Sequence, residues 1–576
     1  MKNLQSNIFE QKWFVPLIIL LVAFVAHGLL LISDFVITDG WWILEFLKEN
    51  NWDKIKYLSQ QNGLYFQRYY YGIYLIFPDP NVAIKVMTFV NLCLISYVTF
   101  LIFKKTDCFS DEESLIIAIT SLTLPTVRVL GNAIPVMMYL SCYLIFLFCA
   151  YLAICAETKN GSMHVVLRGI AVIGFFVSFS CGSLLVFYYG FLIGLVLYEN
   201  KRKQRAVLSF PWGWLCRRID YISIPVIFWL WRITFTPGIG AAGKSYQQPS
   251  LSNLLEAPLQ FGRLLIFTIP EEVFGGVRLL FTITKAGALA VCLSYVIARF
   301  IYRYLPLKNE TVNKVDTLPL FFYGALLLSV AVLPYFVAGY YPAADWFSSR
   351  HALLMAIPVS ILLLVGFRAI FYDSGGRFPH LLLSIFMIMS FSAVDAKTYL
   401  EWQAISVKEQ SVSHNLSKIK GIEDYRLIRV QDESFLNTCY EQTWGRWSYV
   451  LRMVCGDHER YAYNASKYPD KQSIVRHVLV GALMPPYRSP HKTESILNGK
   501  QGIMTIQAGS YFKTNLVLVN EADGQALFEL SKIGMKKKYS MLFTYFYYKI
   551  FKPEYMNEFL GGITKVQIRP VNDLLN

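Results

Sequence analysis

The sequence predicts an α-helical polytopic membrane protein with about eleven transmembrane helices and a C-terminal mixed α/β extracytoplasmic domain. Of its 576 residues, 55% are hydrophobic and 16% are charged, whereas soluble proteins carry about 25% charged residues. Apolar runs long enough to cross a bilayer recur as far as Val394. We therefore expect a multi-span membrane domain over residues 1–396 and a soluble domain over residues 397–576.

The net charge of +15 would suggest a nucleic-acid partner if the chain were soluble. Lysine and arginine gather instead in the loops that alternate spans place in the cytoplasm. No basic patch alternates with base-stacking aromatic residues on a soluble module. The chain is therefore expected to contact membrane lipid and not nucleic acid.

The first span, residues 14–31, is expected to stay uncleaved, because no clear small-x-small cleavage site precedes Asp34. A removed signal peptide is the alternative. Windows of about 20 residues place the further spans at residues 82–103, 113–126, 134–155, 169–180, 184–197, 222–235, 279–301, 318–337, 352–371 and 381–394. The N-terminus is expected to be cytoplasmic, and the odd number of eleven spans then places the tail on the opposite side of the membrane.

The distribution of charge supports this topology. The short outer turns, residues 125–133 and 339–351, hold one arginine each. Positive residues favour cytoplasmic loops, and the predicted inner loops hold Lys104, Lys105, Arg168, Lys201, Arg202, Lys203, Arg205, Arg217, Arg218, Arg303, Lys308, Lys314, Arg368 and Arg377.

The tail is expected to form short strands separated by Gly, Pro and Asn. The segments that favour strands are DYRLIRV, YVLRMVC, SIVRHVLVG, GIMTIQAG, TNLVLVNE and KVQIRPV. Residues 535–551, MKKKYSMLFTYFYYKIF, are basic and then aromatic. This order suits a helix on a membrane surface, and a buried core helix is the alternative.

Only two of the ten cysteines, Cys439 and Cys455, lie in the tail. An even pair in an oxidising compartment predicts a disulfide, with two buried thiols as the alternative. The sequence has no Walker loop, no GxGxxG and no Cys/His set with zinc spacing. No nucleotide cofactor and no metal site are expected, and whether a divalent metal is needed stays open.

The first outer loop carries the sharpest candidate for chemistry, Asp39. Glycine follows it directly, and then comes an amphipathic segment whose Trp41 and Trp42 suit the bilayer interface. A carboxylate at a dry interface resists ionisation and accepts protons near neutral pH. The alternative is an acid that caps the next helix. Asp34 is better suited to the exit of the first span than to catalysis.

The sequence from Arg68, RYYYGIYLIFPDPNVAIKVMTFVNLCLISYVTFLIF, continues the pattern. A first span, an acid near its exit, an amphipathic helix, an aromatic half-span, a proline turn and a full span follow one another. This order resembles the first module of the GT-C superfamily, polytopic glycosyltransferases that take sugars from polyprenyl-phosphate donors. Residues 131–154 resemble the fourth span of that superfamily, and residues 174–199 its next hairpin. Within the superfamily, the chain looks most like bacterial and phage-encoded O-antigen glucosyltransferases that change serotype.

The resemblance implies an inverting hexosyltransferase at the outer face of the bacterial inner membrane. It would move a sugar, glucose by the nearest likeness, from a polyprenyl-phosphate donor to a cell-surface glycan such as O-antigen. The N-terminus would be cytoplasmic and the tail periplasmic. Asp39 would be the base that takes the proton of the acceptor hydroxyl.

The same mechanism needs cations on the leaving phosphate, where charge builds in the transition state. Arginine offers forked donors to phosphate, and a lysine inside a span is costly enough to suggest function. The alternative for each is a cation that snorkels to the interface. The expected phosphate-binding residues are Arg68, Lys85, Arg128, Arg263 and Arg350.

Acids beside aromatic residues suit sugar hydroxyls and sugar faces, although Tyr and Trp also form membrane belts without a ligand. Glu271 and Glu272 are further acids that would assist the base or bind sugar, or else a solvated pair. The candidates for sugar or acceptor binding are Asp34, Trp41, Trp42, Glu271, Glu272, Tyr340, Tyr341 and Asp345.

Three other functions remain open. A polysaccharide polymerase or ligase of the envelope pathway would favour arginines in large outer loops. A transporter or flippase would bury charges inside spans and show inverted repeats; the sequence offers Lys85 and no repeat. A receptor-like scaffold would work through its tail alone.

Overall fold

The computed structural model describes most of the chain. The described residues are 13–36, 40–61, 64–125, 133–202, 218–235, 250–282, 284–304, 317–342, 346–371, 377–432, 444–456, 460–464, 500–508 and 524–571. The chain forms two compact units: unit 1 contains Met1–Ile32 and Ile55–Thr398, and unit 2 contains Ser33–Lys54 and Tyr399–Asn576. The first part of the predicted first outer loop, Ser33–Lys54, is therefore grouped with the tail, an association that sequence reasoning did not make.

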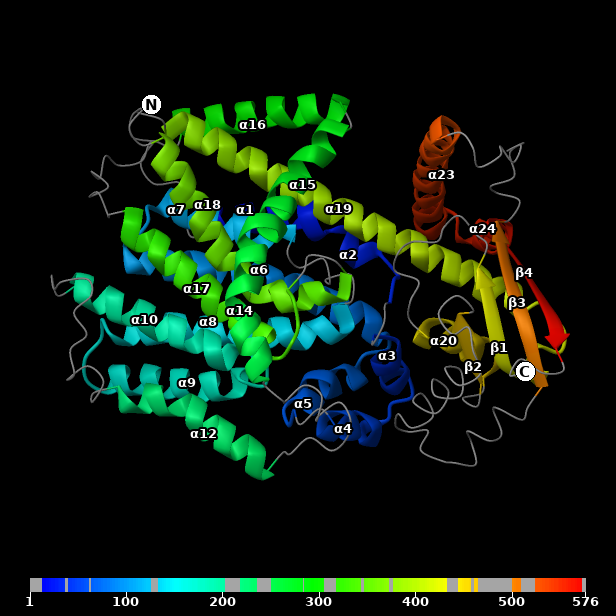
Figure 1. Cartoon of the computed structure of the whole chain (residues 1–576), viewed down its shortest axis with the longest axis horizontal. Helices are drawn as coiled ribbons and strands as arrows, with labels where there is room; N and C mark the ends of the chain where they lie inside the picture. The colour runs from blue at the N-terminus through cyan, green and yellow to red at the C-terminus, as the bar shows by residue number, and fades with distance from the viewer. Residues whose placement is uncertain are drawn as a thin grey trace. The chain divides into compact units, whose positions relative to one another are not determined.

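Unit 1 is built from helices (Figure 1). Most of α4 and the first part of α19 belong to it, and both helices continue into unit 2. The helices are α1 (Phe14–His27), α2 (Leu29–Ile32), α4 (Trp52–Gln61), α5 (Gln67–Gly72), η2 (Ile73–Ile76), α6 (Pro80–Thr106), α7 (Asp111–Thr123), α8 (Ala133–Ala156), α9 (Ser162–Ser178), α10 (Leu184–Arg202), α12 (Ile219–Phe235), α14 (Leu251–Arg263), η4 (Leu264–Thr268), α15 (Ile269–Thr282), α16 (Thr284–Tyr304), α17 (Thr317–Val337), η5 (Trp346–Met355), α18 (Ala356–Phe371) and α19 (Arg377–Leu416).

Local signals start the helices near the predicted positions. The side chain of Asp79 accepts hydrogen bonds from the backbone N–H groups of Asn81 and Val82, and Pro80 occupies the first turn of α6. Ser110 and Glu113 form a reciprocal capping box at the start of α7. Both arrangements satisfy backbone donors that a helix leaves unpaired at its N-terminus.

The α-helical fold class with a small C-terminal mixed α/β part is confirmed. Each predicted span overlaps a helix. Within the described ranges, five helices are long and apolar enough to cross a membrane, or six if one bent pair counts as a single span. The apolar helices α1, α9 and α10 are shorter. The count of eleven spans stays a prediction.

The predicted span over residues 279–301 differs from the structure. The helical segment that ends at Thr282 and the one that starts at Gly287 meet at an angle of 113°. Gly287 permits the close approach, because a Cβ there would lie 2.9 Å from the carbonyl oxygen of Leu280. Hydropathy measures the length of an apolar run and not the direction of the helix axis. The prediction therefore treated two helical segments with different directions as one span.

Helix α19 also extends beyond its predicted end at Val394. It runs for 40 residues, and the expected domain boundary at 396/397 falls inside it. Charged residues such as Lys397 and Glu401 suggested a membrane exit. Farther along the helix, Lys408 and Glu409 are buried within unit 2, so these polar residues do not end the helix.

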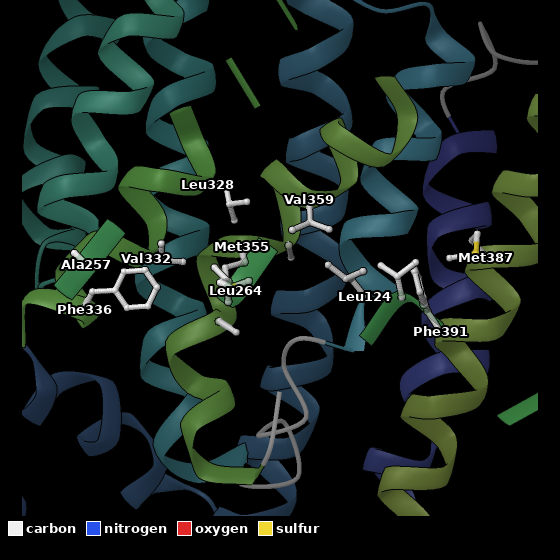
Figure 2. Packing of buried hydrophobic residues seen from close by; sticks show 13 residues of the cluster. Leu124, Ala257, Leu264, Leu328, Val332, Phe336, Met355, Val359, Met387 and Phe391 are labelled. Carbon is white, nitrogen blue, oxygen red and sulfur yellow. The ribbon is translucent and has the colours of Figure 1, made fainter. Parts of the chain in front are cut away.

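The core of unit 1 joins helices from distant parts of the sequence (Figure 2). Phe336 of α17, Val359 of α18 and Phe391 of α19 are buried in one cluster. Leu124, which follows α7, and Leu264 of η4 complete its contacts. Where the unfolded chain would meet water, burial of each large apolar side chain stabilises the fold by about 1.5–3 kcal/mol. Where helices face lipid, close packing between them provides the stabilisation instead.

Basic residues at the predicted cytoplasmic ends of these helices are ion-paired within unit 1. Arg368 of α18 holds Glu113 of α7 through two hydrogen bonds of 2.8 and 2.7 Å. Cationic residues therefore neutralise acids where the positive-inside bias gathers them. The other pairs are Lys104–Asp111, Arg168–Asp220, Arg218–Glu157 and Arg377–Glu112.

Unit 2 contains a four-stranded sheet in the order β2-β1-β3-β4. Strand β1 (Tyr425–Asp432) pairs in parallel with β2 (Tyr461–Asn464) and β3 (Lys500–Ala508), and β3 pairs antiparallel with β4 (Thr564–Val571). The remaining elements are α3 (Gly40–Lys48), η7 (Ile422–Asp424), α20 (Trp444–Cys455), α23 (Gly524–Phe551), η9 (Pro553–Tyr555) and α24 (Met556–Ile563).

Three predicted strands are confirmed as β1, β3 and β4. The segment YVLRMVC is helical instead, because Trp447, Val450 and Leu451 recur at helical spacing and are buried in the core of unit 2. SIVRHVLVG and TNLVLVNE lie outside the described residues. The predicted helix over residues 535–551 is confirmed as part of α23.

Candidate active site

The segment before Asp39 is fixed within unit 2, although Asp39 itself lies outside the described residues. Asp34 accepts a hydrogen bond from the Tyr545 hydroxyl, and its second carboxylate oxygen lies 2.5 Å from Lys549 Nζ. The backbone N–H of Asp34 donates to Gln403 Oε1 at 2.9 Å. Asp34 therefore anchors the backbone five residues before Asp39.

The segment after Asp39 is held by α20. The rings of Trp41 and Tyr449 pack with centroids 4.3 Å apart. Glu45 is buried and lies 3.9 Å from Arg452 Nη1. Helix α3 is thus attached to α20 at two successive turns. Contacts therefore hold the described residues on both sides of position 39.

Two tyrosines in these contacts have raised pKa values. Burial raises the pKa of Tyr545, and the charge of Asp34 raises it further. Burial likewise raises the pKa of Tyr449, with further contributions from Glu45 and Glu409. Both hydroxyls therefore stay protonated at neutral pH. Tyr545 is accordingly a hydrogen-bond donor to Asp34 over the physiological range.

Arg68 lies in unit 1 near the start of α5, where its guanidinium stacks on aromatic rings. Its Cζ is 3.7 Å from the ring centroid of Tyr65 and 5.4 Å from that of Tyr69. Its Nε donates to the Tyr65 carbonyl at 3.1 Å. The Tyr65 ring packs in turn on Trp231 of α12, with centroids 5.5 Å apart. None of the described carboxylates forms an ion pair with Arg68.

The other cationic candidates with described side chains differ in burial. Lys85 is 2% exposed on α6, inside unit 1, where a charge is costly and is commonly functional. Arg263 is exposed at the last residue of α14. Lys85 therefore needs compensating polar groups, whereas Arg263 is accessible to a ligand.

The two adjacent glutamates of α15 also differ. Glu271 is exposed, whereas Glu272 is 5% exposed in the first turn of the helix. One turn later, Gly276 approaches the Ser390 backbone of α19 so closely that a Cβ would lie 2.8 Å from its carbonyl oxygen. The close packing of α15 on α19 explains how Glu272 is buried beside an exposed neighbour.

Tyr340 and Tyr341 follow α17 and make separate contacts in unit 1. The Tyr341 hydroxyl is 2.8 Å from Thr268 Oγ1. The Tyr340 ring stacks on His351, with centroids 5.1 Å apart, and Tyr335 packs on the same imidazole. These contacts create an aromatic and polar cluster that contains a buried histidine. Such groups are suited to sugar faces and hydroxyls.

Several expected site residues lie outside the described residues: Asp39, Arg128, Asp345 and Cys439. The side chains of Trp42 and Arg350 are outside the description as well. Cys455 ends α20 and is half-buried. The Cys439–Cys455 disulfide therefore stays a prediction.

The candidates are divided between the two units. Asp34 and Trp41 belong to unit 2, whereas Arg68, Lys85 and Tyr341 belong to unit 1. Arg263, Glu271, Glu272 and Tyr340 are also in unit 1. The contacts described above are all made within one unit or the other. That all the candidates form a single active site stays a hypothesis.

Sequence reasoning missed a buried polar pair in unit 1. His27 Nε2 lies 2.9 Å from the Leu122 carbonyl oxygen and 3.9 Å from Asp395 Oδ2. Both side chains are almost fully buried. A histidine at the end of one apolar run and an acid at the end of another were available signals. Their proximity depends on packing between α1 and α19.

The described residues contain no group of three His, Cys, Asp or Glu side chains that is able to hold a metal. The chemistry available to these residues is proton transfer by carboxylates and electrostatic stabilisation by arginine and lysine. It does not identify a substrate by itself.

No protein-family model and no curated protein matches this chain. Eight chains of known structure match. One is ArnT from Cupriavidus metallidurans, in a crystal structure with bound undecaprenyl phosphate. It has 11% sequence identity and a TM-score of 0.36, and the match covers 87% of this chain and 94% of that chain. A likeness of this degree does not establish the family of the chain.

Proposed function

We propose that this chain is a membrane glycosyltransferase that moves a sugar from a polyprenyl-phosphate donor to a glycan at the outer face of the bacterial inner membrane. The proposal rests mainly on the surroundings of Arg68. Its guanidinium is half-buried, stacks on Tyr65 and has no ion-pair partner among the described carboxylates.

Arg68 differs in this respect from Arg168, Arg218, Arg368 and Arg377, which all form ion pairs with acids. Stacking on an aromatic ring occupies the face of a guanidinium and leaves N–H donors at its edge. An anion with several oxygens, such as a lipid-linked phosphate, suits that edge. Arg68 would stabilise the charge that accumulates on the departing phosphate.

Asp39 is the proposed base. In the proposed step, the oxygen of an acceptor hydroxyl forms a bond to the anomeric carbon, and the bond from that carbon to the phosphate oxygen breaks. The leaving lipid phosphate takes the bonding electron pair, and Asp39 takes the hydroxyl proton. Attack opposite the leaving group inverts the configuration. The anchors at Asp34 and Trp41 support this role, because a base must be held in position.

The finer assignment rests on the resemblance noted in the sequence. The sugar is proposed to be glucose and the acceptor to be O-antigen, with serotype conversion as the consequence. Among the sugar-binding candidates with described side chains, Tyr340 and Tyr341 offer aromatic faces and Glu272 offers a buried carboxylate, so these three are proposed first. The tail is proposed to be periplasmic.

One observation favours a second candidate, a transporter or flippase of lipid-linked sugar. Lys85, His27 and Asp395 are ionisable residues buried among apolar helices, as expected of a translocation path. A polysaccharide polymerase or ligase remains the other alternative. The three differ in their products, because only the transferase joins one sugar to the acceptor.

The test uses the full-length protein in lipid vesicles with a synthetic polyprenyl-phosphate glucose and an acceptor glycolipid. Mass and linkage analysis should show one added hexose and release of polyprenyl phosphate, and a nucleotide-linked glucose should not serve as donor. Donor translocation without a new glycosidic bond would replace the proposal with the flippase. Chain extension by repeat units would favour the polymerase.

A further inference from the structure

The C-terminal half of helix α23, residues 538–551, has two apolar faces, and the described part of the chain covers one of them. Met541, Leu542 and Tyr545 are at most 2% exposed. They pack against Val407 of α19 and Phe559 of α24 in one core cluster of unit 2. This face accounts for the attachment of the helix to the rest of the unit.

The other face is aromatic and accessible. Phe543 is 75% exposed, Ile550 57% and Phe551 69%. Tyr547, 40% exposed, packs on Phe551 with ring centroids 5.7 Å apart. Positions 543, 547, 550 and 551 share a side at helical spacing, roughly opposite Tyr545 at about 100° per residue. We call these four residues the aromatic face.

Positive charge accompanies the aromatic face. Five lysines and one glutamate occur between Met535 and Tyr555. Lys549 pairs with Asp34, whereas Lys552 is exposed and its ammonium lies 5.5 Å from the ring centroid of Tyr555. Exposed aromatic side chains next to lysines are typical of helices that rest on an anionic membrane surface.

We propose that the aromatic face of α23 docks on the headgroup region of a bilayer that contains anionic lipid. A second copy of this helix would bring like charges together, and a neutral glycan would make little use of the lysines. Anionic lipid complements both the charge and the rings. The same chain also contains helices that are long and apolar enough to cross a membrane.

This inference goes beyond the proposed function and does not depend on it. It gives the two faces of α23 separate tasks. Tyr545 and Lys549 bind Asp34, while the aromatic face contacts lipid. A docked α23 would therefore attach the first outer loop to the membrane surface, whatever reaction that loop supports.

The experiment places one fluorescent amino acid at Phe543 in the full-length protein, reconstituted in phosphatidylcholine vesicles with or without phosphatidylglycerol. Met453 on α20, which is 55% exposed, receives the same probe as the matched control. A nitroxide attached to the lipid should quench the probe at 543 and not at 453. Aqueous iodide should quench in the opposite order.

Charge is tested with the double substitution Lys536→Gln and Lys552→Gln, because position 536 lies two helical turns before Phe543 on the same side of α23. Each lysine near an anionic surface changes the ratio of docked to undocked helix about five-fold, so the pair should change it about 25-fold. Thermal unfolding and the probe at Met453 report whether the variant is folded.

Lipid quenching at 543 that weakens without phosphatidylglycerol, or in the lysine variant, would support the proposal. Equal quenching in all vesicles would overturn the requirement for anionic lipid. Iodide access without lipid quenching would overturn docking. Protection from both quenchers would overturn it too, because protein would then cover the aromatic face.

Discussion

The substitution Arg68→Gln separates a phosphate-binding arginine from a structural one. In the folded protein, Arg68 makes one hydrogen bond to the Tyr65 carbonyl and stacks on the Tyr65 ring. A cation–π contact at a partly exposed site contributes about 0.5–1 kcal/mol, and one hydrogen bond about 0.5–1.5 kcal/mol. The free energy of unfolding should therefore fall by about 1–2.5 kcal/mol.

The expected loss of activity is larger. A hydrogen bond to a charged group contributes about 1.5–3 kcal/mol, and each 1.36 kcal/mol changes a rate about ten-fold. One such bond to the leaving phosphate therefore predicts a fall in kcat/KM of about 10- to 150-fold. Arg68→Lys should give an intermediate loss, because it keeps the charge without the forked donors.

The assay follows glucose transfer from polyprenyl-phosphate glucose to glycolipid, normalised to folded protein. Arg278→Gln is the matched control, since Arg278 is exposed on α15 and is not a candidate site residue. The control should stay close to wild type. If Arg68→Gln stays within two-fold of wild type while it remains folded, Arg68 does not bind the leaving phosphate, and Arg263 is the next residue to test.

Three further predictions concern architecture. Glu113→Gln should lower the free energy of unfolding by about 3–5 kcal/mol, because it leaves Arg368 buried without its charged partner; thermal unfolding in detergent measures this, and adding Arg368→Gln should restore most of the loss, so an unchanged single variant would contradict the pairing. A reporter active only in the periplasm should work when fused after Asn576, and an inactive fusion would reverse the topology. Cys439 and Cys455 should resist alkylation until they are reduced, whereas reaction in untreated membranes would exclude the disulfide.

Much of the helical pattern could be predicted because a span needs a long apolar run. Hydropathy failed to predict the end of α19, where the helix is surrounded by other parts of the protein and not by lipid. Beyond Val394, Gln403, Lys408 and Glu409 are buried, although hydropathy treats them as solvent-exposed. The segment YVLRMVC, which starts at Tyr449, resembled a strand because it was read without the preceding residues, which form the first turns of α20.

The candidate site could be predicted only as residue types. Tyr65 and Arg68 are three positions apart, so their contact was accessible to an argument from near neighbours in the sequence. The contacts of Asp34 were not, because Tyr545 and Lys549 lie 511 and 515 residues farther along the chain. Such pairing arises from tertiary packing and leaves no local pattern in a single sequence.

The most direct test of the proposed mechanism is Asp39→Asn, measured as sugar transfer from a polyprenyl-phosphate donor by equal amounts of folded protein. Asparagine caps helices about as well as aspartate but does not take up the proton. A general base contributes about 10²- to 10⁴-fold in rate, so transfer should fall on that scale, while Asp53→Asn in the same outer loop stays near wild type. An Asp39→Asn protein that retains most of its transfer activity would show that Asp39 is not the base.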